Sequence, residues 1–182
     1  ISLVTDPDYL FDPETGIYVA GRIFEEWRDD PEAYDPDVTW GFPANYSQRG
    51  RAWERPTLDD LSSPVVMTYC TPGSTTGPDP TNPDCSYQRE VGLRVHGRFS
   101  RTFPQKSLRL YARNDYGDRR FDAPLFGADG PSGHRRLLLR NSGNDNHRTM
   151  LADAFLQSLM TALAVDTQAY QPVVVYLNGE YW

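Results

Sequence analysis

The stretch that decides the fold of this chain reads Glu90-Val91-Gly92-Leu93-Arg94-Val95-His96-Gly97-Arg98-Phe99-Ser100-Arg101-Thr102-Phe103-Pro104-Gln105-Lys106-Ser107-Leu108-Arg109-Leu110-Tyr111. Apolar residues alternate with polar ones in its first and last parts, which predicts two strands with one buried and one solvated face. The turn between them contains Gly, Ser and Pro and carries Arg98, Arg101 and Lys106. Two interpretations of this cationic turn stay open: the residues bind an anion, or they are solvated charges at a sheet edge.

Working outward, the same patterns predict further elements. Short apolar runs predict strands at 2–4, 17–19, 64–70, 134–140 and 172–177. Apolar residues then recur at intervals of three and four, which predicts one main amphipathic helix over about 147–164, with Asn144-Asp145-Asn146 as N-cap candidates. Asn178-Gly179 is typical of a hairpin turn into a returning strand. The fold class expected is therefore α+β, built on a mostly antiparallel sheet.

The organisation along the chain is expected to be that of one structural unit with two parts. Residues 1–63 are rich in aromatic and turn-forming residues, and 24–50 show no sustained period. Acidic turns such as Asp35-Pro36-Asp37 lack the spacing of a helix–loop–helix calcium site, so a solvated loop is favoured there. Residues 64–182 hold the predicted core, and we expect the returning strand and the fold to continue beyond Trp182.

The composition excludes some classes of function. A chain of 182 residues with 38% hydrophobic and 13% aromatic content is expected to fold. Its net charge of -7 argues against a general nucleic-acid-binding protein, although a local site for a small phosphate stays possible. No apolar run reaches the length of about 18 residues that a membrane span needs.

Two cysteines, Cys70 and Cys85, flank a loop rich in Pro, Gly and Thr. We expect them to form a disulfide, which implies an exported protein; two free thiols in a cytosolic protein are the alternative. A zinc site is not expected, because none of the three histidines has ligand spacing relative to the cysteines.

Common catalytic motifs are absent from the sequence. There is no Walker-type loop, no dinucleotide-binding glycine pattern and no Gly-x-Ser-x-Gly elbow. A second polar turn, Arg140-Asn141-Ser142-Gly143-Asn144-Asp145, precedes the predicted helix, whose N-terminus attracts anions. If the helix packs on the sheet, the two polar turns flank one cleft.

The ordered combination of these blocks resembles a known family. Residues 92–101 followed by 103–110 resemble the signature of the CotH kinase-like family, the spore coat protein H proteins, in which a strand ending in Arg-x-x-Gly-x-x-Ser leads through a Pro-Lys-Lys-Ser-like turn into the next strand. Residues 139–145, the helix after them and residues 178–182 resemble later blocks in the same order. Trp53-Glu54-Arg55-Pro56 is similar to the lead-in of exported bacterial members.

The resemblance implies the N-terminal portion of an atypical protein kinase that uses ATP and Mg²⁺ to phosphorylate Ser or Thr of coat or extracellular proteins. It implies that Lys106 contacts the nucleotide phosphates, with Arg98 and Ser100 lining the same turn. Gln105 stands where the family often has a second Lys. Further candidates for the site are Arg101, Asn141, Asp145 and Asp153.

In this family the catalytic and metal-binding Asp residues follow the block that resembles 178–182. The resemblance therefore places catalytic and metal-binding residues beyond Trp182, and residues 1–182 by themselves are expected not to turn over ATP. The expected partners are a nucleotide and a protein substrate or cell-surface partner, at an exported, extracellular, cell-surface or spore-surface location.

Two other functions are compatible with the sequence. The first is a non-catalytic cell-surface adhesion or binding module that keeps the same fold. The second is a carbohydrate-binding β-rich domain that uses exposed aromatic residues as platforms, namely Trp27, Trp40, Tyr46 and Trp53.

Overall fold

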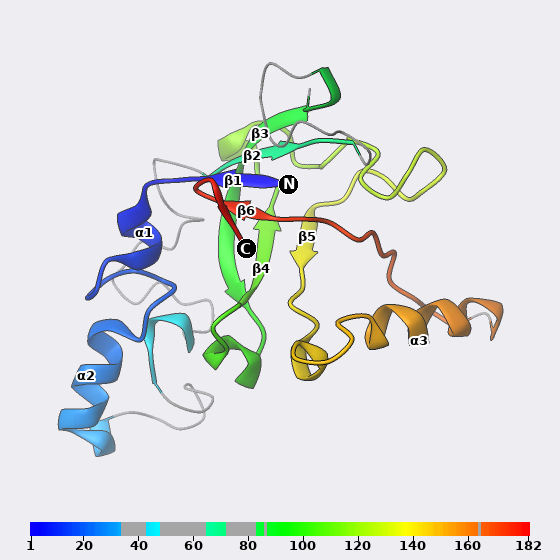
Figure 1. Cartoon of the computed structure of the whole chain (residues 1–182). Helices are drawn as coiled ribbons and strands as arrows, with labels where there is room; N and C mark the ends of the chain where they lie inside the picture. Colours follow the sequence, from blue (N-terminus) through cyan, green and yellow to red (C-terminus); the bar gives the residue numbers. More distant parts are fainter. Residues whose placement is uncertain (34–42, 48–64, 72–82, 86, 164) are drawn as a thin grey trace.

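The computed structural model describes residues 1–33, 43–47, 65–71, 83–85, 87–163 and 165–182. Within these residues the chain forms a mixed α+β fold around a seven-stranded sheet in the order β5-β4-β3-β2-β1-β6-β7 (Figure 1). Neighbouring strands are antiparallel except for the parallel pair β1 and β6, which confirms the predicted mostly antiparallel sheet. The strands are β1 (Ser2–Val4), β2 (Val65–Tyr69), β3 (Tyr87–His96), β4 (Ser107–Tyr111), β5 (Arg136–Leu139), β6 (Tyr176–Leu177) and β7 (Glu180–Tyr181).

The strands β3 and β4 are the two that the opening stretch predicted, and β5 lies within the strand predicted at 134–140. Their register places Leu93 opposite Leu110, and Leu110 opposite Leu137. Leu93 and Leu110 are completely buried, and they contribute to a core that also contains Phe121. Because alternate residues of a strand point to opposite faces, Arg94 and Arg109, together with Leu138 of β5, lie on the opposite face of the sheet.

Two short helices in the N-terminal part were not predicted: α1 (Pro7–Phe11) and α2 (Gly21–Asp29). The side chain of Asp6 accepts a hydrogen bond from Asp8 N, and Pro7 occupies the first turn, so the pattern interpreted as a turn is a capped helix start. In α2 only Ile23 is buried, although Phe24 and Trp27 are also apolar and lie at helical spacing from it or beside it.

The strand predicted at 17–19 is wrong. Ile17 N and Tyr18 N donate to the carbonyl oxygens of Tyr9 and Leu10, so this segment folds back on α1 and pairs with no strand. The strand predicted at 172–177 is confirmed only at Tyr176–Leu177, because its partner β1 offers only Ser2 and Leu3 for pairing.

The predicted helix is present but shorter than expected. Helix α3 spans Ala152–Met160 and continues as a 3-10 turn, Thr161–Leu163. Met150 has a φ of 57°, which is incompatible with a right-handed helix, so the helix begins five residues later than predicted. None of its residues is buried, and the side chains of Phe155, Leu156 and Leu159 are more than half exposed. Figure 1 shows that α3 extends away from the sheet. The helix therefore does not pack on the sheet, which was the condition for the two polar turns to flank one cleft.

The hairpin turn at Asn178-Gly179 is confirmed by the antiparallel pairing of β6 with β7. The disulfide between Cys70 and Cys85 is also confirmed.

In the described ranges, no helix has the length and apolar character needed to cross a membrane. The sequence-based interpretations of Asp35-Pro36-Asp37, Trp40 and Trp53-Glu54-Arg55-Pro56 concern residues outside the described ones. Short 3-10 turns complete the structure at Pro31–Ala33, Asn45–Ser47 (η2), Pro83–Cys85, Phe99–Thr102 (η4), Asn114–Tyr116 and Gly143–Asp145.

Candidate functional site

Lys106 lies immediately before β4, on the side of the strand that faces the core, and only 5% of its surface is exposed. Its Nζ donates a hydrogen bond of 2.8 Å to the carbonyl oxygen of Phe103. The same Nζ lies 4.9 Å from the ring centroid of Tyr18 and 4.3 Å from that of Tyr46. We call these three groups, the Phe103 carbonyl and the two tyrosine rings, the lysine cage.

The cage is assembled from segments that are distant in sequence. The Tyr18 hydroxyl donates to Pro104 O and accepts from Lys106 N, each at 2.8 Å, so it fixes the chain on both sides of Gln105. The ring of Trp182 meets the ring of Tyr18 edge-on at 4.9 Å. The cage therefore depends on contacts among the N-terminal segment, the β3–β4 turn and the end of the chain.

Burial lowers the pKa of Lys106 from 10.5 to about 8. At pH 7 most of the amine is still protonated, so the cage holds a cation. No described carboxylate is paired with this cation, and buried lysines are rare unless paired. Lys106 is also the only lysine of the chain. A partly desolvated ammonium of this kind can act as a point charge for an anion such as a phosphate.

The turn beside the cage carries the other predicted cations. Arg98 is exposed and Ser100 is half-buried within η4. Arg101 donates from its guanidinium to Ser47 O at 2.9 Å, which ties η4 to η2, the turn that carries Tyr46. The structure therefore brings Arg101 into the support of the lysine cage, while the predicted phosphate contacts of Arg98 and Ser100 stay predictions.

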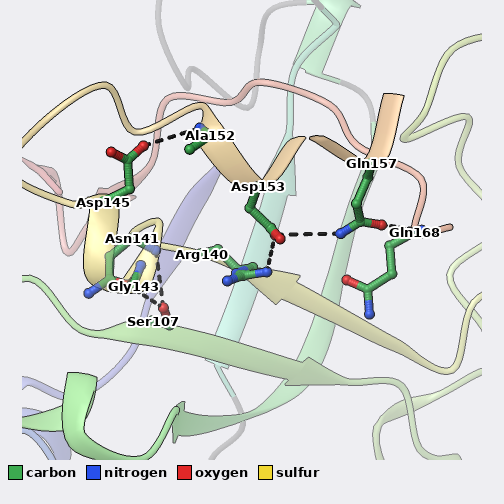
Figure 2. A network of polar contacts seen from close by, with 9 residues as sticks. All are labelled: Ser107, Arg140, Asn141, Gly143, Asp145, Ala152, Asp153, Gln157 and Gln168. Carbon is green, nitrogen blue, oxygen red and sulfur yellow. Dashed lines mark hydrogen bonds and ion pairs between the residues drawn. The ribbon is translucent and has the colours of Figure 1, made fainter. Parts of the chain in front are cut away.

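Asn141 connects the second polar turn to the strand that begins at Lys106 (Figure 2). Its Oδ1 accepts hydrogen bonds from Ser107 Oγ at 2.8 Å and from Gly143 N at 2.9 Å. Its Nδ2 donates to Gln105 O, and its backbone N donates to Ser107 Oγ at 3.1 Å. Asn141 is 3% exposed, so it fixes the residues on both sides of Lys106 from a buried position.

The two predicted aspartates support α3 (Figure 2). Asp145 accepts from Thr149 Oγ1 at 2.5 Å and from Ala152 N at 3.1 Å, and these hydrogen bonds, that from the Thr149 hydroxyl first, lower its pKa. Asp153 forms an ion pair with Arg140. Over the described ranges, no three His, Cys, Asp or Glu side chains are grouped to hold a metal ion.

The sequence analysis missed the two tyrosines of the cage. Tyr46 was interpreted as an exposed recognition residue, which is wrong, because it is partly buried beside Lys106. Trp27 is also partly buried, with its ring 5.7 Å from that of Phe24. The signal that pointed to the site was the cationic turn with Arg98, Arg101 and Lys106 and its resemblance to a family signature, but nothing in the sequence identified the aromatic neighbours of Lys106.

His96, at the end of β3, is expected to stay neutral down to a pH of about 4. Its Nε2 accepts from the guanidinium of Arg109 at 3.2 Å, because a guanidinium can only donate. Burial first, then the charges of Arg109, Arg101 and Arg140, lower its pKa from 6.5 to about 4. An NMR titration of the imidazole measures this directly.

The lowered pKa of His96 makes the free energy of unfolding depend on pH. Between pH 6.5 and about 4 the unfolded chain binds a proton at this residue and the folded chain does not, so stability falls as the pH falls through this window. A His96→Gln variant, in urea unfolding at a series of pH values, should lose less stability across the window than the wild type. Equal losses in the two proteins contradict the assignment.

Comparison with known proteins gives one match. Residues 93–182 match the model of a family described as CotH kinase protein, and the matched segment contains Lys106 and Asn141. No curated protein and no solved structure matches the chain. Residues 93–182 of this chain are therefore similar to the CotH kinase family.

Proposed function

We propose that this chain binds the phosphates of ATP through Lys106, as the N-terminal part of an atypical protein kinase that phosphorylates Ser or Thr of coat or extracellular proteins. The observation that carries the proposal is the lysine cage: one buried ammonium, with no paired described carboxylate, in the family-matched segment. Burying such a charge is costly, so its presence favours a function over a structural role.

The cage defines what Lys106 does when a nucleotide binds. Its Nζ donates to Phe103 O, and a phosphate oxygen is a stronger acceptor because it is charged. The ammonium therefore exchanges the Phe103 carbonyl for a phosphate oxygen, while the tyrosine rings continue to stabilise its charge from the side. Asn141 keeps Gln105 and Ser107 in place, so the exchange moves the side chain of Lys106 and not the strand. Arg98 and Ser100 provide further phosphate contacts from η4.

The cofactors follow from the family. ATP supplies the phosphoryl group, and Mg²⁺ neutralises the charge on its phosphates in kinases generally. The ammonium of Lys106, which the cage holds, fits a phosphate. In the described part of the chain, however, Asp145 supports the start of α3 and Asp153 pairs with Arg140, so neither forms a ligand set with other carboxylates. We therefore assign no step to the metal and no catalytic base to these residues.

The location proposed is outside the cytoplasm. The Cys70–Cys85 disulfide is compatible with an oxidising, extracellular or surface environment, and so is the similarity of residues 93–182 to the CotH kinase family. We propose that the protein is exported and acts on a surface or extracellular protein.

An ATP acyl phosphate, which transfers its acyl group to a nearby amine, tests the nucleotide site. Lys106 is the only lysine, so the N-terminal amine is the one other amine that the probe can label. Mass spectrometry distinguishes the two labelled positions. We expect labelling of Lys106 that excess ATP suppresses, and a stabilisation by ATP of about 2.7 kcal/mol at a hundredfold excess over the dissociation constant. The Lys106→Met variant should lose at least about tenfold in ATP affinity, since it removes a charge-assisted hydrogen bond.

Two results contradict the proposal. The first is labelling that excess ATP does not suppress, and the second is equal stabilisation by ATP of the wild type and of Lys106→Met. An Arg148→Met variant, which removes an exposed cation elsewhere, is the control and should bind ATP like the wild type. A protein that ATP, ATP with Mg²⁺ and AMP all fail to stabilise is assigned instead to the non-catalytic binding module.

A further inference from the structure

Strand β5 lies at one end of the sheet, and part of its outer edge is open (Figure 1). Ala112 N donates to Arg135 O at 3.0 Å, in the register that pairs β4 with β5. Hydrogen-bonded and non-bonded pairs alternate along an antiparallel ladder, so the backbone groups of Arg136 and Leu138 point away from β4. Over the described ranges, the N–H and C=O groups of these two residues form no hydrogen bond.

The chain itself begins to pair with this edge and then leaves it. Phe121 N donates to His134 O at 2.7 Å, which forms an isolated antiparallel bridge just before β5. A longer pairing of this kind would cover the rest of the edge. The guanidinium of Arg89, however, donates to Asp118 O and Arg120 O, each at 2.6 Å, and so holds the preceding segment to β3. The edge is therefore able to pair with a strand, and its outward groups are left open within β5.

The charges along the edge differ between its start and its end. Arg135 and Arg136 are exposed at the start, where Arg136 also lies over the ring of Tyr111. Arg140, which follows the strand, forms an ion pair with Asp153. The positive charge that a partner meets is therefore concentrated at the start of β5.

The middle and the end of the edge are apolar. Leu137 is buried in the core, and Leu139 is partly buried against it on the same face of the sheet. Side chains directly opposite each other on neighbouring strands share a face, so apolar residues opposite these leucines would extend the core. In an antiparallel partner the acidic residues that match the start of β5 come after these apolar ones.

We propose that the outer edge of β5 binds an extended segment of a partner polypeptide as an added antiparallel strand, in which apolar residues are followed by acidic ones. The open backbone groups of Arg136 and Leu138 supply the main-chain hydrogen bonds of such an addition. A second copy of this chain matches the edge less well, because pairing two β5 strands brings their exposed arginines together. The edge is formed by residues other than the lysine cage, so the proposal does not depend on nucleotide binding.

Fluorescence anisotropy with a labelled peptide that contains Val-Thr-Val-Glu-Glu tests the proposal. In the proposed register the Thr lies opposite Leu138, the second Val opposite Leu137 and the first Glu opposite Arg136. N-methylation of the Thr should weaken binding by at least about tenfold, because the methyl group removes a main-chain donor and takes its place against β5. N-methylation of the second Val, whose N–H points to solvent, is the matched control and should change the affinity less than about twofold.

Variants of the protein test the same edge from the other side. Leu138→Pro removes an N–H that the sheet does not use, so this variant should fold and should lose about tenfold in affinity for the peptide. Arg136→Gln should lose about threefold, since it removes the cation opposite the first Glu. Arg148→Gln makes the same change in net charge at an exposed position away from the edge and should bind like the wild type.

Four results overturn the proposal. The first is no measurable binding of the unmethylated peptide. The second is equal affinity for the peptides methylated at the Thr and at the second Val, a comparison that uses the wild type and so holds even if Leu138→Pro does not fold. The third is unchanged affinity in a folded Leu138→Pro variant. The fourth is a wild-type dimer that Leu138→Pro converts to a monomer, which assigns the edge to a second copy of the chain.

Discussion

Replacing Asn141 by alanine is expected to lower the free energy of unfolding by about 3 kcal/mol, because it leaves buried and partly buried polar groups without this partner. The side chain bonds Ser107 Oγ in a buried position and Gly143 N and Gln105 O in partly buried ones, and it is itself 3% exposed, so water replaces these hydrogen bonds poorly. Urea unfolding followed by circular dichroism measures the loss. The expected effect is large because one amide joins the second polar turn to the start of β4.

The matched control is Asn144→Ala, three residues away and exposed, which should change stability by less than about 0.5 kcal/mol. Asn141→Ala should also weaken labelling of Lys106 by the ATP acyl phosphate, since Gln105 and Ser107 flank that lysine. If Asn141→Ala is as stable as Asn144→Ala, the network in Figure 2 does not hold the two segments together.

Replacing Gly21 by alanine is expected to destabilise the protein by about 3 kcal/mol and to disturb the lysine cage. Gly21 has a φ of 63°, and a Cβ at this position would lie 2.0 Å from Asn45 Nδ2. Asn45 would have to move, and its hydrogen bonds to Glu14 O (2.8 Å) and Gly16 O (3.0 Å) would be lost. Asn45 precedes Tyr46 directly, so the ring over Lys106 moves with it.

Two measurements check this prediction. Urea unfolding gives the loss of stability, and NMR of the single lysine gives its pKa, which should rise from about 8 toward 10.5 as the cage opens. The control is Gly127→Ala, where φ is also positive at 87° but no atom lies within 4 Å of the added Cβ. This control should show the backbone strain alone, about 1 kcal/mol, with the pKa of Lys106 unchanged. An unchanged lysine pKa in Gly21→Ala means that Tyr46 is not positioned through Asn45.

The elements predicted best from the sequence are those with a strong local pattern. The alternation around Leu93 and Leu110 predicted β3 and β4, because each strand has one face in the core. The hairpin at Asn178-Gly179 and the disulfide were predicted from residue type alone. Helix α2 was missed although Ile23 and Trp27 lie four residues apart, because its nine residues are too few to show a sustained period. The start of α3 was misplaced because the left-handed conformation of Met150 leaves no mark in the hydrophobic pattern.

The sequence by itself determined that one cationic turn joins two strands, that Lys106 lies at its end, and that the blocks around it resemble one family. Only the tertiary structure decided the surroundings of these residues. Tyr18 and Tyr46 reach Lys106 from segments far from it in the chain, and strand register sets Arg94 opposite Arg109. The physical reason is that a sequence pattern records which face of an element is buried, whereas the partners of a side chain depend on how distant segments pack.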